Sequence, residues 1–378
     1  MVGLLSFHWA DDYGAMLQAY ALKHYLESLG EEAEFIPYAP FKFTGRYWWM
    51  PLYAFLKKGY TWYIPSPFSW KRNLRLGKSF WERRRIMAGF RCHYLCAAPP
   101  KRTLKNISLK KYTCVLVGSD QVWNPAITVG LSDAYLGNLQ GKENCRLVSY
   151  AASFGGSCLP AEYLPKFAQS VGKNFAAISL REKSAAPFVE GLLHRKVTDV
   201  LDPVFLLQRE EWEKLENRPQ EKGYILTYWT KYDRQLMNYL RLLSERTRKK
   251  VLQLNKPGAE ETPGWIELRI AGGPREFIGY IQNAACVITN SFHATAFSIL
   301  LEKPFFVFRH SSWNSRMEDL LKKLQLQARM TDESAPPQAE DIWKETDWGQ
   351  VRRLLETERE RSAAFIRDNL KGEEPCRS

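Results

Sequence analysis

The sequence predicts an α/β protein with two domains, each built on a parallel sheet. The chain has 378 residues, of which 45% are hydrophobic, and this length is enough to bury two cores. The clearest unit is 286–308, in which an apolar run (286–289), a turn, a helix of small residues (about 292–301) and a second apolar run (305–308) follow one another. Because the connections are very short, this order is typical of a parallel sheet.

In the first half of the chain, short apolar runs alternate with helical patterns. The helix predicted from about 15 to 29 places one face at i, i+3, i+4 and i+7 and ends at Gly30. Prolines and glycines interrupt the alternation in 41–110, where we expect helices, best at 69–87, and a long excursion over the mouth of the domain. We place the first domain at 1–206. Its predicted strands are 2–7, 34–37, 112–117, 146–151, 176–180 and 197–201.

The alternation starts again after a charged helical link, 207–222. Asn314 and Ser315 are suited to cap a late helix, and a long charged helix is predicted at about 348–370. We place the second domain at 207–347 and treat 348–378 as a separate C-terminal segment. The other predicted elements are strands at 224–228, 250–254, 265–268, 286–289 and 305–308 and helices at 233–246, 276–283 and 292–301.

Polar residues that follow the predicted strands are candidates for a binding site. Open α/β sheets bind ligands beyond the carboxyl ends of their strands, and the free N–H groups of a helix N-terminus attract anions. His293 lies in the first turn of the helix that Asn290 and Ser291 are suited to cap. It is either an anion-contacting or acid/base histidine, or a capping or packed one, and both interpretations stay open here.

Three further strand ends in the first domain carry candidate residues. Asp120 could take a proton from a hydroxyl group of a ligand or cap the next turn. Ser153 lies in a small-residue loop that suits a polar ligand but is also compatible with an ordinary loop. Arg181 could bind a carboxylate or phosphate by two parallel hydrogen bonds, or form a salt bridge with Glu182 or Asp202.

The turn of residues 8–14 follows the first strand and resembles a phosphate-facing or substrate-facing loop. It contains two carboxylates, Asp11 and Asp12. Carboxylates beside an anionic ligand would repel it, so these two face an uncharged part of the ligand, such as hydroxyl groups, or point away from the site.

Positive charge is concentrated between residues 42 and 85. This segment has eleven basic residues and one acid, so it carries +10 of the net charge of +13 and leaves +3 for the rest (13 − 10). Its aromatic residues include Trp48, Trp49, Trp62, Trp70 and Trp81. The segment is either a solvated helical face over an aromatic core or a surface for peripheral membrane contact, where cations meet anionic lipid. Nucleic acid is the least favoured partner, and we expect none.

Cysteine usage and hydropathy indicate a cytoplasmic protein. The seven cysteines are scattered without a framework, as expected for reduced thiols, and no metal-ligand spacing is found. The N-terminus lacks the pattern of a signal peptide, and no apolar run is long enough to cross a bilayer.

Seven segments, in order, resemble the polysaccharide pyruvyl transferase family and together run from residue 3 to about residue 324. They are GLLSFHWADDYGAMLQAYALKHYL (3–26), VGSDQVWNP (117–125), VSYAASFG (148–155), ISLREKS (178–184), VLDPVFLL (200–207), TNSFHATAFSILLEKPFFVF (289–308) and NSRMEDLLKKL (314–324). The resemblance implies a GT-B-like architecture of two Rossmann-like domains, with the C-terminal helix crossing back to the first domain.

The resemblance also implies an activity, the transfer of the enolpyruvyl unit of phosphoenolpyruvate to a sugar as a pyruvate ketal. No cofactor or metal is needed, since phosphoenolpyruvate is a co-substrate, and the partner is a saccharide acceptor, free or lipid-linked, at the inner face of the membrane. The implied site residues are His293 and Asp120 for catalysis, Arg181, Ser291, Arg316 and Asn290 for the donor, and Asp12, Tyr13, Gln121, Trp123 and Ser153 for the acceptor.

The sequence departs from the family pattern at two places. Many members have an arginine where this chain has Ser291, and Arg316 is expected to supply the missing charge. The family favours amides where this chain has Asp11 and Asp12. Two other functions remain alternatives: a glycosyltransferase that uses a nucleotide-sugar, and a non-catalytic polysaccharide-assembly protein.

Overall fold

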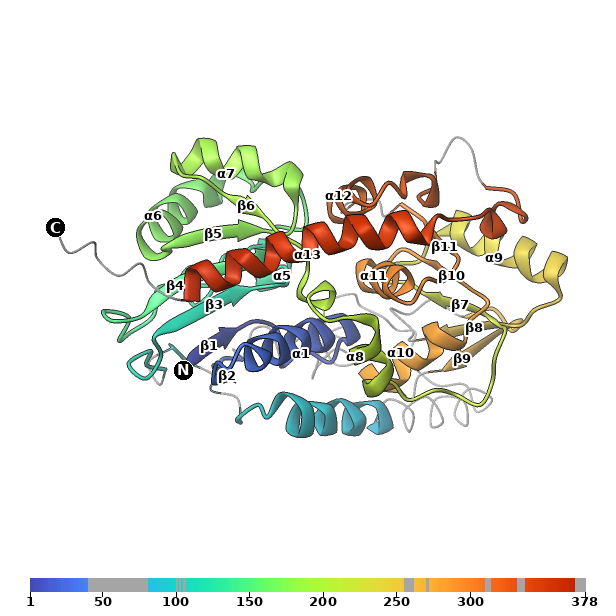
Figure 1. The fold of residues 1–378 in the computed structure, drawn as a ribbon, viewed down its shortest axis with the longest axis horizontal. Coiled ribbons are helices and arrows are strands. Elements are labelled where there is room, and N and C mark those ends of the chain that lie inside the picture. Colours follow the sequence, from blue (N-terminus) through green and yellow to red (C-terminus); the bar gives the residue numbers. More distant parts are fainter. Residues whose placement is uncertain are drawn as a thin grey trace, which may run out of the picture.

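The computed structural model describes residues 1–39, 81–99, 101, 103–104, 107–254, 262–269, 272–309, 314–331 and 337–370. Two parallel sheets lie next to each other, each flanked by helices, and one long helix runs past both (Figure 1). Most of the predicted excursion at 41–110, including the first part of the helix predicted at 69–87, falls outside the described residues.

The first sheet has six strands in the order β2-β1-β3-β4-β5-β6. Each pair of neighbouring strands in this sheet is parallel, which confirms the sheet type predicted from the short connections. The strands are β1 (Val2–Leu5), β2 (Ala33–Phe35), β3 (Cys114–Gly118), β4 (Arg146–Ala152), β5 (Ala177–Leu180) and β6 (Thr198–Asp199). The helices on this sheet are α1 (Tyr13–Ser28), α5 (Pro125–Thr128), α6 (Leu164–Asn174) and α7 (Ala186–Leu193). The strand order reverses between β1 and β3, and such a switch point opens a crevice beyond the carboxyl ends.

The second sheet has five parallel strands in the order β11-β10-β7-β8-β9. Its strands are β7 (Ile225–Tyr228), β8 (Val251–Leu254), β9 (Ile266–Arg269), β10 (Cys286–Thr289) and β11 (Phe305–Val307). Its helices are α9 (Arg234–Thr247), α10 (Pro274–Asn283), α11 (Phe292–Leu300) and α12 (Ser315–Lys323). A second switch point lies between β7 and β10. Each sheet therefore has a crevice beyond the carboxyl ends of its strands, at the point where its strand order reverses.

The two domains share one apolar core. A single cluster of buried side chains includes Leu4 and Leu116 of the first sheet and Leu226 and Val287 of the second. Trp212 of the linking helix α8 (Arg209–Leu215) is fully buried in it. Its indole N–H donates to the carbonyl of Val204 at 3.1 Å, and its ring meets Phe297 of α11 edge-on with 4.9 Å between centroids. This packing holds α11 against the first domain.

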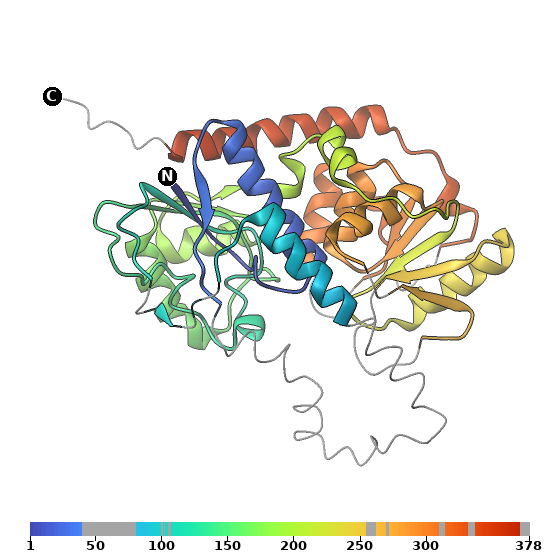
Figure 2. The same ribbon diagram turned by 90° about the horizontal axis from the view of Figure 1, so that it is seen from below.

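Residues 81–90 form a helix that lies beside α1 and continues into a π-helical turn, Arg91–Leu95 (Figure 2). Met87 and Phe90 are buried against α1, while Trp81 is 72% exposed. The helical prediction for this part of the chain is therefore confirmed from residue 81 onward.

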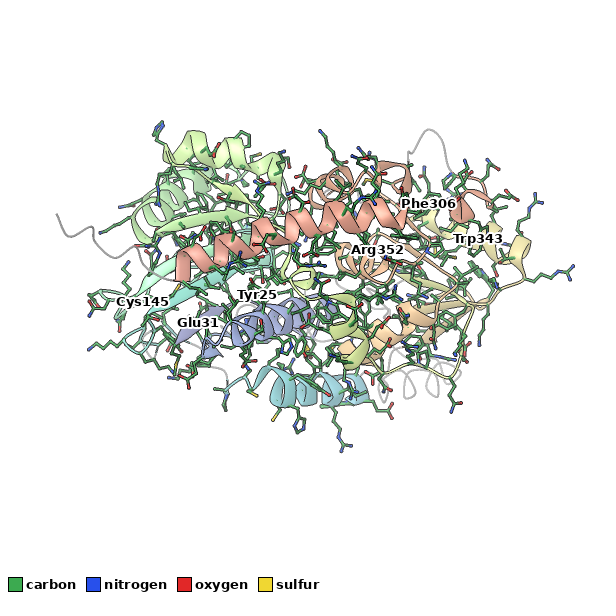
Figure 3. The ribbon with its side chains drawn as sticks, viewed as in Figure 1. Tyr25, Glu31, Cys145, Phe306, Trp343 and Arg352 are labelled. Carbon is green, nitrogen blue, oxygen red and sulfur yellow. The ribbon has the colours of Figure 1, made fainter. Side chains whose placement is uncertain are left out.

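The last helix, α13 (Trp348–Leu370), crosses back from the second domain to the first, as predicted (Figure 1). Near its start, Arg352 pairs with Glu302 of the second domain at 3.1 Å. Near its end, Arg367 donates to the hydroxyl of Tyr25 on α1 at 3.4 Å, and the labelled Arg352 and Tyr25 mark the two regions (Figure 3). Between them, the hydroxyl of Ser362 accepts from the backbone N–H of Leu201 at 2.9 Å. In the part of the chain that the structure describes, no helix is sufficiently long and apolar to cross a bilayer.

Candidate functional site

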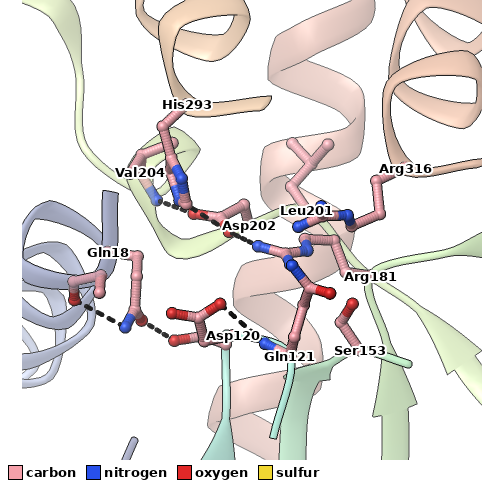
Figure 4. Close-up of polar contacts among 12 residues, drawn as sticks. Gln18, Asp120, Gln121, Ser153, Arg181, Leu201, Asp202, Val204, His293 and Arg316 are labelled. Carbon is pink, nitrogen blue, oxygen red and sulfur yellow. Dashed lines mark hydrogen bonds and ion pairs between the residues drawn. The ribbon is translucent and has the colours of Figure 1, made fainter. Parts of the chain in front are cut away.

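Side chains from both domains meet beyond the carboxyl ends of β3, β4 and β5, opposite the start of α11 and of α12 (Figure 4). Asp120 and Arg181 follow strands of the first sheet, whereas His293 and Arg316 lie in the first turns of helices of the second domain. Asp120 and Arg181 lie together because parallel strands end at the same edge of a sheet. Packing of the second domain against the first brings His293 and Arg316 to the same place.

Arg181 is held by a buried ion pair but keeps unpaired donors. It is 4% exposed, and its Nη1 donates to Oδ2 of Asp202 at 2.6 Å. Nε and Nη2 are buried without a hydrogen-bond partner among the described residues. The guanidinium lies over the ring of Phe292, 4.7 Å from its centroid. The salt-bridge interpretation is therefore correct for one edge of Arg181, and the other edge remains available to an anion.

Asp202 joins Arg181 to His293. Its Oδ2 lies 3.7 Å from Nε2 of His293, and its Oδ1 accepts from the N–H of Val204 at 3.1 Å. Burial by itself would raise the pKa of Asp202, but hydrogen bonds and charge from His293 and Arg181 hold the pKa below its usual value. A carboxylate that stays ionised can orient both the guanidinium and the imidazole.

His293 packs against the backbone of α1. A Cβ atom at Gly14 would lie 1.9 Å from Nδ1 of His293, so only glycine leaves room for this ring. The ring is 9% exposed and points towards Asp202 (Figure 4). The N-cap position of α11 belongs to Ser291, whose side chain makes no capping hydrogen bond. His293 therefore lies between the start of α1, the start of α11 and a carboxylate.

The second arginine, Arg316, faces a fully buried carboxyl group. Its Nε is 3.9 Å from Oε1 of Glu182, which also accepts a hydrogen bond from Ser153. Burial and the neighbouring charge of Arg181 together lower the pKa of Arg316 to about 10, although the charge of Glu182 acts in the opposite direction. With its amide oxygen turned towards Arg316, Gln121 accepts from Nη1 at 3.3 Å and from Nη2 at 3.2 Å. Arg316 and Gln121 thus lie at the site. Ser153 contacts it indirectly, through its hydrogen bond to Glu182.

Asp120 is a further carboxyl group that interacts electrostatically with Arg181 and His293. One of its carboxylate oxygens accepts from the N–H of Gln121 at 2.8 Å. Burial raises the pKa of Asp120, although the charges of Arg181 and His293 act in the opposite direction. A carboxyl group with a raised pKa exchanges protons closer to neutral pH, as acid–base catalysis requires.

A family model described as polysaccharide pyruvyl transferase matches residues 12–312, which is most of the chain. The chain belongs to this family. No curated protein sequence matches it significantly.

Solved structures show the fold alone. The putative UDP-N-acetylglucosamine 2-epimerase from Listeria monocytogenes is 11% identical, with a TM-score of 0.50 over 98% of this chain and 96% of that one. The UDP-GlcNAc 2-epimerase from Neisseria meningitidis bound to UDP-GlcNAc is also 11% identical, with a TM-score of 0.47 over 98% of both chains. The likeness to the first of these structures, together with the two parallel sheets flanked by helices, confirms the predicted GT-B architecture.

Two residues that the family resemblance assigned to the acceptor are packed elsewhere in this pyruvyl transferase family member. Trp123 is fully buried, and its indole N–H donates to the carbonyl of Tyr135 at 2.9 Å. Tyr13 is 1% exposed, stacks on Phe277 of α10 and donates its hydroxyl to Gly272 at 3.2 Å. Trp123 therefore lies in the core and Tyr13 at the interface between the domains, and their contact with the acceptor stays a prediction.

The side chains of Asp12 and Asn290 form hydrogen bonds to the backbone of the protein. Oδ1 of Asp12 accepts from the N–H of Ala15 at 3.0 Å, which makes it the N-cap of α1. Oδ1 of Asn290 accepts from the N–H of Thr230 at 2.9 Å, and its Nδ2 donates to the carbonyl of Lys231 at 2.8 Å. These groups are used in helix capping and loop bonding, and their contacts with the acceptor and the donor stay predictions.

The structure adds three residues that sequence reasoning did not assign to the site: Gly14, Glu182 and Asp202. Asp202 directly follows a predicted strand and Glu182 comes two residues after another, and this position was a usable signal. Asp11 pairs with Arg91 at 2.6 Å, so its charge is balanced beside the site. Among the described residues, no three His, Cys, Asp or Glu side chains are arranged to hold a metal ion.

Proposed function

We propose that the chain is a ketal-forming pyruvyl transferase that uses phosphoenolpyruvate as donor and a saccharide as acceptor. The proposal rests on the family membership. The observation that carries it is Arg181, whose Nε and Nη2 are buried without partners next to the start of α11. Buried donors without acceptors are costly, and a bound carboxylate or phosphate would satisfy them.

The donor has two anionic groups, and the site has two places for them. We assign one anionic group to the guanidinium edges of Arg181 and Arg316, which both lie over the ring of Phe292. We assign the other to the free N–H groups at the start of α11, beside His293. The N-cap residue of this helix, Ser291, makes no capping hydrogen bond with its side chain. This assignment leaves the enol carbon atoms between the two cations and Asp120.

The reaction needs one acid and one base. A proton from His293 adds to the methylene carbon of the donor, and the adjacent carbon becomes oxocarbenium-like. A sugar hydroxyl attacks that carbon and passes its proton to Asp120. The C–O bond to phosphate then breaks, a second hydroxyl closes the ketal with loss of its proton, and inorganic phosphate is the second product. Preorganised cations lower the barrier by stabilising the charge of the leaving phosphate.

Two alternatives use the same architecture: a nucleotide-sugar glycosyltransferase and a non-catalytic assembly protein. The decisive measurement is the melting temperature with phosphoenolpyruvate and, separately, with a panel of nucleotide-sugars, because a ligand that binds only the folded state stabilises it. We expect a rise with phosphoenolpyruvate alone. A rise with a nucleotide-sugar alone would favour the glycosyltransferase, and no rise with either would favour the assembly protein.

Contact with the cytoplasmic face of a membrane, where a lipid-linked acceptor would lie, is part of the proposal. Its support among the described residues is the helix at 81–90, where Trp81 is 72% exposed beside Arg84. Cosedimentation with vesicles that contain anionic lipid tests it: Trp81→Ser should reduce binding, whereas binding that is equal with neutral vesicles would exclude an electrostatic contact.

A further inference from the structure

Helix α12 presents one row of polar side chains to the first domain. Arg316, Asp319 and Lys323 are spaced i, i+3 and i+7, which places them on the same side of a helix. Each contacts a residue of the first domain. The partners are Glu182 for Arg316, Ser184 for Asp319 and Asp199 for Lys323.

The central contact holds the turn that carries Arg181. Oδ2 of Asp319 accepts two hydrogen bonds from Ser184, one from the backbone N–H at 2.9 Å and one from the hydroxyl at 2.9 Å. Ser184 lies in the short connection between β5 and α7, three residues after Arg181 and two after Glu182. Oδ2 of Asp319, in the second domain, therefore binds the segment of the first domain that carries Arg181.

The two guanidiniums need such a support because they have the same charge. Arg181 and Arg316 lie over one ring, Phe292, with centroid distances of 4.7 Å and 5.7 Å. Arg316 comes one helical turn before Asp319, so the bonds to Ser184 hold the turn of α12 that carries Arg316 next to the segment that carries Arg181. A site held at the right spacing before the ligand arrives loses less free energy on binding.

We propose that Asp319 is a positioning residue of the donor site, which acts by fixing the distance between Arg316 and Arg181 across the domain boundary. The inference rests on the proposed function in one respect, that the donor's anionic groups contact both arginines. Asp319 itself does not touch the donor.

The test is a double-mutant cycle on donor affinity, measured by titration calorimetry with phosphoenolpyruvate. Asp319→Ala should weaken binding about tenfold, which is within the range of coupling energies between neighbouring residues. In an Arg316→Ala background the same change should have almost no further effect, because there is no guanidinium left to position. Asp319→Asn keeps an oxygen that can accept from Ser184, so it should restore part of the affinity.

The matched control is Glu318→Ala. Glu318 is the neighbouring acid on α12, is exposed and pairs with Arg309, so this change removes the same charge without touching Ser184. It should leave affinity within about twofold, as expected for exposed pairs. If Glu318→Ala weakens binding as much as Asp319→Ala, the effect is one of overall charge and the inference is wrong.

Equal losses from Asp319→Ala in the two backgrounds would also overturn the inference, since Asp319 would then act independently of Arg316. Should Asp319→Ala not fold, Ser184→Ala removes one of the two hydrogen bonds and takes its place in the cycle. Inorganic phosphate and pyruvate are titrated in parallel. If the wild type binds one of these but not phosphoenolpyruvate, the proposed function fails and the cycle is judged with that anion. If it binds none of the three, the two arginines do not form an anion site that Asp319 could position, and the inference is wrong.

Discussion

Replacing Arg181 should separate its part in folding from its part in donor binding. Arg181→Met keeps the length of the side chain and removes the charge that faces Asp202, whose side chain is fully buried. Breaking a buried ion pair from one side costs about 3–5 kcal/mol, a large share of a typical stability of about 5–15 kcal/mol. The loss should be near the lower end of that range, because Asp202 keeps its hydrogen bond from Val204 and its contact with His293.

Donor affinity should fall as well. Charge-assisted hydrogen bonds contribute about 1.5–3 kcal/mol, which corresponds to roughly 10-fold to 150-fold in the dissociation constant. Arg181→Lys should retain only part of the affinity, since an ammonium group cannot reproduce the planar fork.

The double variant Arg181→Met with Asp202→Asn distinguishes the two roles. It removes both buried charges, and such replacements are often neutral for stability. Urea unfolding followed by tryptophan fluorescence should therefore show most of the lost free energy restored, while calorimetry should show donor affinity as low as in the single variant. If the double variant binds phosphoenolpyruvate like the wild type, Arg181 serves only to balance Asp202, and the assigned donor site is wrong.

Three further outcomes are expected. Gly14→Ala should cost about 1–3 kcal/mol of stability in a urea unfolding assay and should lower turnover, because its Cβ would collide with Nδ1 of His293. The control is Gly191→Ala, at a helix position with no atom nearby, which should be neutral or stabilising in the same assay. His293→Gln should keep donor binding but lose turnover at least roughly 100-fold in a phosphate-release assay; weakened binding with a smaller loss in the chemical step would mean that His293 only holds phosphate. Burial lowers the pKa of His8 from 6.5 to about 4, so the unfolded chain takes up a proton there before the folded one does. The free energy of unfolding should therefore fall by roughly 3 kcal/mol between pH 6.5 and 4, and His8→Phe should flatten this part of the stability profile unless another group causes it.

The sequence was sufficient for the elements whose signals are local. Strand β10 and helix α13 have the bounds that were predicted, because a short apolar run and a long charged periodic segment need no tertiary information. The placement of Asp120 and Arg181 at one edge also followed from sequence, since strand ends in a parallel sheet share an edge. The approach of His293 to them depends on how the two domains pack. Predicted strands such as 2–7 and 197–201 proved shorter, as β1 and β6 end where pairing with their neighbours ends.

Only the tertiary structure decided what each polar group near that edge is bonded to. Asp12 and Asn290 stand in the sequence beside the site, yet their oxygens are used by the N–H groups of Ala15 and Thr230. Asp202 was visible only as one of two possible partners for Arg181, and its contact with His293 joins residues from the two domains. A local pattern reports which side of an element a residue occupies, but the partner of a buried polar atom depends on elements far along the chain.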